Sequence, residues 1–189
     1  GSRVVGPTIA DDIKSGAVYS IIFSLIVVFL YILIRFRKWQ FSLGAVVALL
    51  HDVLFVMGVF SLADGFLPFQ LEVDQAFIAA ILTVIGYSLN DTVVVFDRIR
   101  EEIGVNPDLG NKALMIKTIN ESINHTMSRT VMTATTVFLV VTVLLIFGGD
   151  VLRGFSFAMF IGVVFGAYSS IFVAAPIVID LGTSSKPKK

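Results

Sequence analysis

Residues Ala17–Ile34 read AVYSIIFSLIVVFLYILI, eighteen residues without a formal charge. A helix needs roughly 17–25 such residues to cross the hydrocarbon core of a bilayer. Helix is favoured over strand because a single segment in lipid must satisfy its own backbone hydrogen bonds. The stretch also lacks the apolar–polar alternation of barrel strands. It therefore predicts an all-α membrane protein, with this stretch as its first transmembrane helix.

Four further apolar stretches predict a polytopic bundle of five transmembrane helices, the others being Phe41–Ala63, Gln75–Phe96, Thr130–Phe147 and Gly154–Ile179. The composition agrees: 56% of the residues are hydrophobic, 15% are charged and the mean hydropathy is +0.91, whereas soluble domains carry about 25% charged residues. We expect one transmembrane domain over residues 17–182, an external N-terminal segment over 1–16 and a cytoplasmic tail over 183–189.

The distribution of Lys and Arg predicts the orientation, since cytoplasmic loops are enriched in both. If the turn after the first span is cytoplasmic, that side collects Arg35, Arg37, Lys38, Arg98, Arg100, Lys112, Lys117, Arg129, Lys186, Lys188 and Lys189. The other side holds only Arg3, Lys14 and Arg153. The N-terminus is then external and the C-terminus cytoplasmic. An external N-terminus with no signal peptide before it also suggests a fragment that lacks at least one earlier helix.

The segment between the third and fourth spans contains a turn cluster, Asn106–Gly110, followed by an amphipathic stretch over about 111–128. One face of that stretch carries Ile116, Ile119, Ile123 and Met127. We expect a cytoplasmic amphipathic helix that lies along the membrane surface.

Only two formal charges fall inside the five spans, Asp52 and Asp91. An Asp at a helix centre costs about 2.5–3.5 kcal/mol on insertion scales, so such residues are functional candidates by default. The alternative is that either carboxylate only hydrogen-bonds a neighbouring helix.

Asp91 lies in a polar arc of its helix, at about 100° per residue, together with Thr83, Tyr87, Ser88 and Asn90. Thr92, Asp97 and Arg98 of the same stretch are predicted to support this polar face around Asp91. Asp91 precedes Arg98 by seven residues, which places it about 10 Å below the cytoplasmic boundary.

Arg129 opens the fourth span and would reach Asp91 if the two helices pack together; otherwise it is a positive-inside anchor. Desolvation favours a protonated carboxyl group and a nearby guanidinium favours the ionised form. A helix shift that moves Arg129 would therefore release or bind a proton at Asp91.

Asp52 follows Gly44 and Ala48 at four-residue spacing, which allows close helix contact beside it. It either extends the proton path or bonds across an interface, and the structural role is slightly favoured. His51 is interpreted as a packing residue and His125 as a surface residue.

The fifth span carries a stripe of small residues at every fourth position, which predicts a tightly packed helix face that can slide. The stripe consists of Gly154, Ala158, Gly162, Gly166, Ser170 and Ala174. Pro176 is expected to kink the inner end of this helix.

The sequence shows no motif for other kinds of chemistry. There is no cysteine, no His or carboxylate cluster with metal-ligand spacing and no phosphate-binding glycine loop. No nucleophile–base pair is evident. We therefore expect neither an enzyme nor a metal or organic cofactor, and no nucleic-acid partner.

The stretch GYSLNDTVVVFDRIRE at residues 86–101 closely resembles the signature of the SecD/SecF family, of the resistance-nodulation-division type. Supporting matches are Val5–Thr8, Tyr31–Phe36, Leu50–Asp52 and Ser128–Thr130. The resemblance implies a six-helix membrane subunit with an external domain between its first two helices. Here the first helix and that domain are missing.

The resemblance also implies a function: using the proton-motive force to drive late steps of preprotein export in the bacterial inner membrane. SecD, the SecYEG channel and exported preproteins are the implied partners, beside the lipid bilayer. Asp91 and Arg129 match the family's coupling residues, which favours their pairing. Some relatives are thought to use sodium, so proton and sodium both stay open.

Two other classes remain as alternatives. A proton-coupled exporter of small molecules or lipids from the same superfamily would also need buried carboxylates. An intramembrane aspartyl protease would use Asp52 and Asp91 as its dyad, but the flanking motif of such enzymes is missing.

Overall fold

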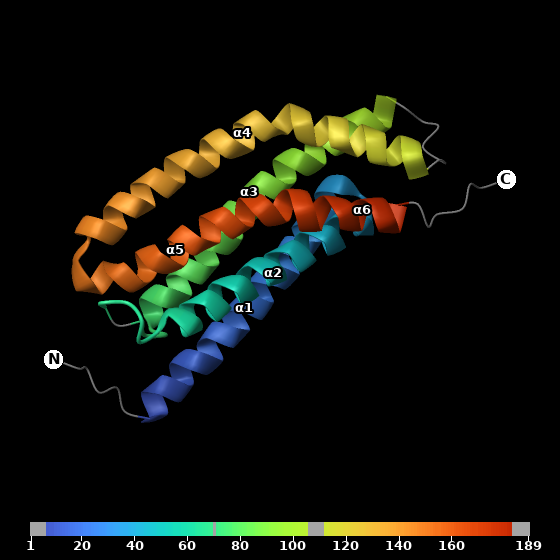
Figure 1. Cartoon of the computed structure of the whole chain (residues 1–189). Coiled ribbons are helices and arrows are strands. Elements are labelled where there is room, and N and C mark those ends of the chain that lie inside the picture. The colour runs from blue at the N-terminus through green and yellow to red at the C-terminus, as the bar shows by residue number, and fades with distance from the viewer. Residues whose placement is uncertain (1–6, 70, 106–111, 183–189) are drawn as a thin grey trace.

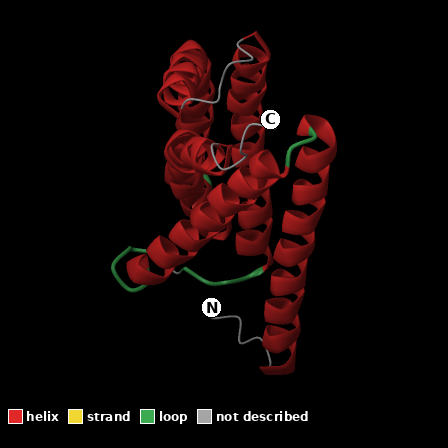
Figure 2. Cartoon of the chain, turned by 90° about the vertical axis from the view of Figure 1, so that its right-hand side faces the viewer, coloured by secondary structure: helices red, strands yellow, loops and turns green. Residues whose placement is uncertain are grey.

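The computed structural model describes residues 7–69, 71–105 and 112–182, and every regular element in these ranges is a helix (Figures 1 and 2). The helices are α1 (Pro7–Phe36), α2 (Trp39–Ala63), α3 (Gln75–Val105), α4 (Lys112–Phe147), α5 (Gly149–Ser169), the π-helical turn η1 (Ser170–Ala174) and α6 (Ala175–Gly182). α5, η1 and α6 follow one another as one continuous rod (Figure 1). Five helical stretches are long and apolar enough to cross a membrane, so the all-α transmembrane class is confirmed.

Helix ends differ from the expected bounds at several places. α1 begins at Pro7, well before Ala17, so part of the expected external segment is helical. A proline is tolerated in the first turn because its missing N–H would have no partner there. The remainder of that segment (1–6), the turn at 106–110 and the tail at 183–189 lie outside the described residues.

The amphipathic stretch is corrected by the structure. It is helical, but it continues into the fourth span as the single 36-residue helix α4, which is about 54 Å long (Figure 1). It therefore extends α4 and is not a separate helix. Its buried face consists of Met115, Thr118, Ile119, Ser122 and Thr126, and it packs against α3 and α6. Hydropathy alone divided α4 because the polar residues around Arg129 interrupt the apolar run.

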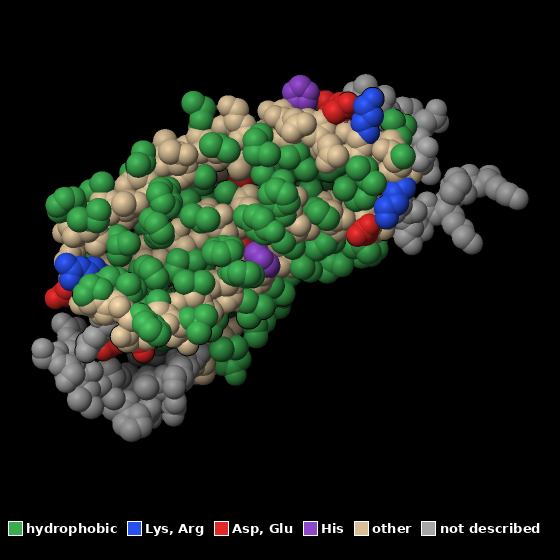
Figure 3. All heavy atoms as spheres, viewed as in Figure 1, with side chains coloured by type: hydrophobic (Ala, Val, Ile, Leu, Met, Phe, Trp, Pro, Cys, Tyr) green, Lys and Arg blue, Asp and Glu red, His purple; other side chains and the backbone are tan. Residues whose placement is uncertain are grey.

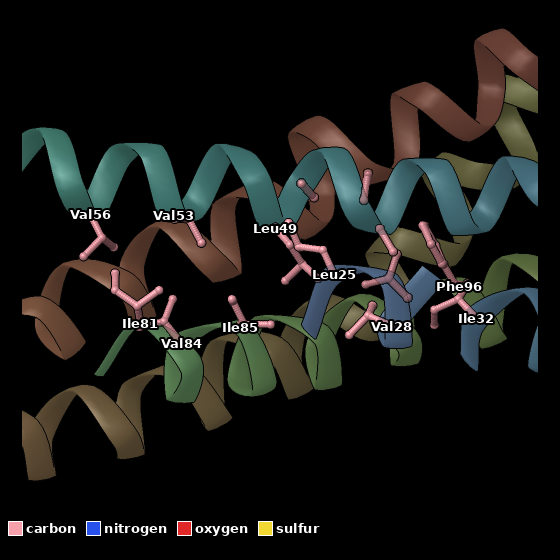
Figure 4. Close-up of a cluster of buried hydrophobic side chains, with 14 of the residues drawn as sticks. Leu25, Val28, Ile32, Leu49, Val53, Val56, Ile81, Val84, Ile85 and Phe96 are labelled. Carbon is pink, nitrogen blue, oxygen red and sulfur yellow. The ribbon is translucent and has the colours of Figure 1, made fainter. Parts of the chain in front are cut away.

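The rod that starts with α5 is the centre of the bundle. α5 packs against α2, α3 and α4, whereas α1 packs mainly against α2. Figure 4 shows apolar side chains of α1, α2 and α3 meeting in one buried cluster, which includes Leu25, Val28, Ile32, Leu49, Val53, Val56, Ile81, Val84 and Ile85. Outside this core, apolar side chains cover the middle of the molecular face and most charged side chains gather toward its two ends (Figure 3). This surface suits a chain that is solvated by lipid along its middle.

Two local features set the ends of α3. Asp74 caps its start, since Oδ1 accepts a 2.8 Å hydrogen bond from the backbone N–H of Phe77. Near its other end the ring of Phe96 packs edge-on against Phe36 and Phe41, with ring centroids 5.9 and 5.0 Å apart. α3 is thus held at both ends, and the polar residues between them face defined neighbours.

Candidate functional site

Asp91 is held between α3 and α4. The hydroxyl of Thr130 donates a 2.7 Å hydrogen bond to Asp91 Oδ1, and only 7% of Asp91 is exposed. Its other oxygen, Oδ2, is buried and has no hydrogen bond within 3.5 Å among the described residues, although the Ser170 hydroxyl is near enough to act on the carboxylate. Since most buried polar atoms in proteins are satisfied, this open oxygen marks Asp91 as an incomplete site.

Arg129 lies on the neighbouring helix, as its expected pairing with Asp91 requires, because α3 and α4 pack together. Its side chain is exposed, and within the described part of the chain no ion pair of 4.0 Å or less joins it to Asp91. It is close enough for its charge to act on that carboxylate. The direct partner is the next residue, Thr130, about 100° further around α4. The pairing of Asp91 with Arg129 therefore stays a prediction for another arrangement of these helices.

The polar arc of α3 divides between two environments. Ser88 and Thr92 are buried, Tyr87 is partly buried, and Thr83 and Asn90 are exposed. The Thr92 hydroxyl bonds the Ser88 carbonyl at 3.0 Å and shares a 2.8 Å hydrogen bond with the Ser170 hydroxyl. Ser88 and Thr92 thus belong to the interior of the bundle, while Asn90 lies on a side of α3 that this chain leaves uncovered.

Asp97 and Arg98 are not brought to Asp91. Asp97 accepts hydrogen bonds of 2.9 and 2.8 Å from Arg35 at the end of α1. Arg98 pairs along its own helix with Glu101 at 3.1 Å and Glu102 at 2.6 Å. Asp97 thus links this end of α3 to α1. Arg98 pairs along α3 itself.

Asp52 is fully buried at the junction of α2, α3 and α5. Its Oδ2 accepts hydrogen bonds from Ser88 at 2.6 Å and Ser169 at 2.8 Å. Its Oδ1 lies 3.2 Å from Nδ1 of His51. Both oxygens of Asp52 therefore have partners, and they come from three helices.

The serines at the start of the π-helical turn connect the two carboxylates. Ser169 bonds Asp52, whereas its neighbour Ser170 bonds Thr92 beside Asp91. A π-turn widens the helix by one residue per turn and is common at functional sites. It ends at Ala174, two residues before Pro176, which has no N–H to donate to an α-helical hydrogen bond.

The sequence analysis missed Ser169 and Thr130 as partners of the carboxylates. Each lies next to a residue that was singled out, Ser170 in one case and Arg129 in the other. Adjacency was the available signal, but it does not say which of two neighbouring side chains faces inward.

The small-residue stripe lies along the packed side of the central rod. Ala158, Gly162, Gly166, Ser170 and Ala174 are buried, and Gly154 is half-buried near Phe60. A Cβ on Gly162 would collide with Val84, and one on Gly166 would lie 3.0 Å from Cβ of Ser88. The stripe therefore lets α5 approach α3 at the turn that carries Ser88.

Metal binding has no obvious site in the described ranges, where no group of three or more His, Cys, Asp or Glu could hold an ion. The ionisable groups of this site are the carboxyl groups of Asp52 and Asp91 and the imidazole of His51.

Comparison with known proteins identifies the family. The model of the protein export membrane protein SecD/SecF family, C-terminal part, matches residues 2–184. The protein translocase subunit SecF of Rhodothermus marinus is 60% identical over 180 residues, which cover 95% of this chain and 57% of that protein. The protein translocase subunit SecDF of Brucella abortus is 43% identical over 186 residues, covering 98% of this chain and 23% of that one.

A solved structure agrees with these sequences. The crystal structure of SecDF from Thermus thermophilus, described as a translocon-associated membrane protein, matches with a TM-score of 0.80 and 40% sequence identity. The match covers 94% of this chain and 23% of that one. This chain spans about half the length of the SecF relatives that it matches. It belongs to the SecD/SecF family of protein-export membrane proteins, with which it shares the C-terminal membrane region.

Proposed function

We propose that this chain is part of a membrane subunit of the Sec protein-export machinery, in which proton movement at Asp91 drives late steps of preprotein translocation. Support for the export role comes from the relatives, which are named protein translocase subunits. Relatives that join SecD and SecF in one chain favour SecD as a direct partner. The SecYEG channel and the exported preprotein complete the proposed assembly.

The observation that carries the proton proposal is the half-satisfied carboxylate of Asp91. Thr130 bonds one oxygen, and the other is buried without a partner. A buried acceptor without a partner costs about 1–3 kcal/mol. Two events relieve the cost of the buried charge: a proton binds the carboxylate, or a positively charged group approaches it.

Arg129 is the group positioned to supply the positive charge. It lies next to Thr130 on α4, so a rotation or shift of α4 exchanges a hydroxyl for a guanidinium at Asp91. Approach of Arg129 favours the ionised carboxylate and expels the proton, and withdrawal favours its return. Movement of α4 and protonation of Asp91 are in this way linked in both directions, and the coupled ion is a proton.

Orientation follows from the charge distribution. The ends of α3 and α4 that carry Arg98, Arg100 and Lys112 face the cytoplasm in this proposal. Asp91 then lies on the cytoplasmic side of the midplane, and protons from outside must cross most of the bundle to reach it.

Asp91→Asn in the full-length protein tests the proposal. We expect export to fall to the level measured without a proton gradient, because an amide cannot bind and release the proton. Membrane insertion and assembly with partner subunits, measured by pull-down, should be unchanged. Export that still responds to the gradient as in the wild type would refute the proton proposal.

Arg129 is tested by two substitutions of different charge. Arg129→Met should lower gradient-dependent export as strongly as Asp91→Asn, whereas Arg129→Lys keeps a positive charge and should retain part of it. The measurement is again export with and without a gradient. Wild-type gradient-dependent export in both variants would assign Arg129 to anchoring alone.

A further inference from the structure

The pair formed by His51 and Asp52 is a second ionisable site in the middle of the bundle. Asp52 is fully buried, while about a fifth of the His51 side chain, 22%, is exposed on the outside of α2. The distance from Nδ1 to Asp52 Oδ1 is 3.2 Å. His51 is thus accessible from the exterior of this chain, and Asp52 lies in its interior.

The three contacts of Asp52 suit a proton better than a metal cation. Ser88 and Ser169 both donate to Oδ2 at 2.6 and 2.8 Å, so that oxygen already has two hydrogen-bond donors. The third contact is an imidazole nitrogen, whereas sodium prefers oxygen ligands. When Nδ1 carries a proton it donates to Oδ1, and when the carboxyl is protonated Oδ1 donates to Nδ1.

Aromatic rings hold the imidazole in place. The ring of His51 lies 4.4 Å from that of Phe55 on its own helix, and 6.3 and 6.2 Å from Phe165 and Tyr168 of α5, centroid to centroid. Tyr168 is the titratable group among these. In the described part of the chain, His51 is the ionisable group whose charge acts on Asp52.

A short polar connection joins this pair to Asp91. Ser88 bonds Asp52 through its hydroxyl and Thr92 through its carbonyl. Thr92 in turn shares a hydrogen bond with Ser170. Asp91 follows Ser88 by three residues, so Asp52 contacts the turn of α3 that carries Asp91.

We propose that His51 and Asp52 form a proton-exchange pair that brings protons into the bundle beside the turn of α3 that carries Asp91. The inference rests on the proposed function and deepens it, by adding His51 as a proton-carrying residue and protons as the ion. In the exchange step the Nδ1–H bond of the imidazolium breaks and an O–H bond forms on Asp52, which leaves both groups neutral. The reverse step restores the ion pair.

Infrared difference spectroscopy of the full-length protein in lipid vesicles tests the exchange, since a protonated carboxyl group has its own carbonyl band. We expect two titrating carboxyl bands, one lost in Asp91→Asn and the other in Asp52→Asn. His51→Asn keeps an amide near the position of Nδ1 but carries no exchangeable charge. It should move the pH midpoint of the Asp52 band.

His125→Asn is the matched control, because His125 is the other of the two histidines and is exposed on α4. It should move neither band. If Asp52→Asn removes no titrating band, or if His51→Asn leaves the midpoint of the Asp52 band in place, the exchange pair is refuted. Because His51→Asn retains the buried carboxylate and its serine donors, this test does not depend on the folding of the Asp52 variant.

Export assays connect the pair to the relay. His51→Phe keeps an aromatic ring against Phe55 and Tyr168 but binds no proton, so it should lose most of the gradient-dependent export while His125→Asn keeps it. Wild-type export in His51→Phe would overturn the delivery role. These outcomes are separate from the test of the proposed function, which fails only if Asp91→Asn exports normally.

Discussion

Asp52 and Asp91 are the same residue type at comparable cost in the bilayer, but the bundle treats them differently. Asp52 receives donors at both oxygens, from α2, α3 and α5. Asp91 receives one hydrogen bond of ordinary length, from Thr130 on α4, a weaker influence from Ser170, and no partner within 3.5 Å at its second oxygen. Both sites involve α3. Asp52 bonds side chains from three helices, whereas one oxygen of Asp91 is open to a new partner. The difference teaches that burial alone does not show how firmly a carboxylate is held; the number of its hydrogen-bond partners does.

The largest expected effect comes from removing each carboxylate and measuring stability. Asp52→Ala strips the partner from two buried serine hydroxyls, and hydrogen bonds to a charged group contribute about 1.5–3 kcal/mol each. We expect the free energy of unfolding to fall by about 3 kcal/mol, since Ser169 also bonds the Gly166 carbonyl at 3.2 Å and loses less. Asp91→Ala also removes an unsatisfied oxygen and should stay within about 1 kcal/mol of the wild type.

Reversible unfolding in detergent micelles measures both variants under one condition, and export assays complete the comparison. Asp91→Ala should be stable and inactive. Equal destabilisation by the two substitutions would show that the open oxygen of Asp91 makes no difference to its role.

A smaller effect is expected where α5 meets the turn of α3 that serves both sites. A Cβ on Gly166 would lie 3.0 Å from Cβ and 3.3 Å from Oγ of Ser88. Gly166→Ala should therefore displace the donor to Asp52 and cost about 1–3 kcal/mol, as overpacking does. Gly86→Ala is the matched control, since Gly86 lies on α3 with nothing within 4 Å of the added atom.

Unfolding measurements on both glycine variants decide whether this contact matters. Gly86→Ala should be neutral or stabilising by up to about 1 kcal/mol, because alanine is the better helix former. If Gly166→Ala is as harmless as Gly86→Ala, then Ser88 moves aside freely and Asp52 does not depend on the close approach of α5.

The smallest effect is expected at Thr130. Thr130→Val keeps the shape of the side chain but leaves Asp91 without its donor, which should cost about 1 kcal/mol in stability. Thr130→Ser keeps the hydroxyl and should be nearly neutral. Both are measured by thermal unfolding, with gradient-dependent export followed in parallel. A stable and fully active Thr130→Val would mean that Asp91 needs no donor from α4, and the contrast with Asp52 would be stronger than the structure indicates.

The bundle shows how far sequence patterns reach. The five apolar runs predicted five membrane-crossing helices correctly, because lipid leaves a chain few other ways to satisfy its backbone. The bounds were less accurate. Hydropathy divided α4 near Arg129, although a helix continues through polar residues when its buried face remains packed, as Thr118, Ser122 and Thr126 are.

The sequence predicted the carboxylates of the candidate site but not the contacts that they make. Asp52 and Asp91 stood out because charges inside apolar runs are rare. Their partners did not stand out, because a serine or threonine in a membrane helix is common and bonds its own backbone when nothing else is near. Thr133 and Thr142 do this here, toward the carbonyls of Arg129 and Phe138, whereas Thr130 bonds Asp91.

The sequence by itself determined the class of this protein, its membrane-crossing segments and the two buried carboxylates, since these follow from composition and from the cost of a charge in lipid. It also carried the family signature at residues 86–101. Only the tertiary structure decided that Thr130 and not Arg129 contacts Asp91, that Ser169 reaches Asp52, and that His51 completes that second site. The physical reason is rotation: neighbouring residues on a helix differ by about 100° in direction, and only the packing of the helices selects which of them faces inward.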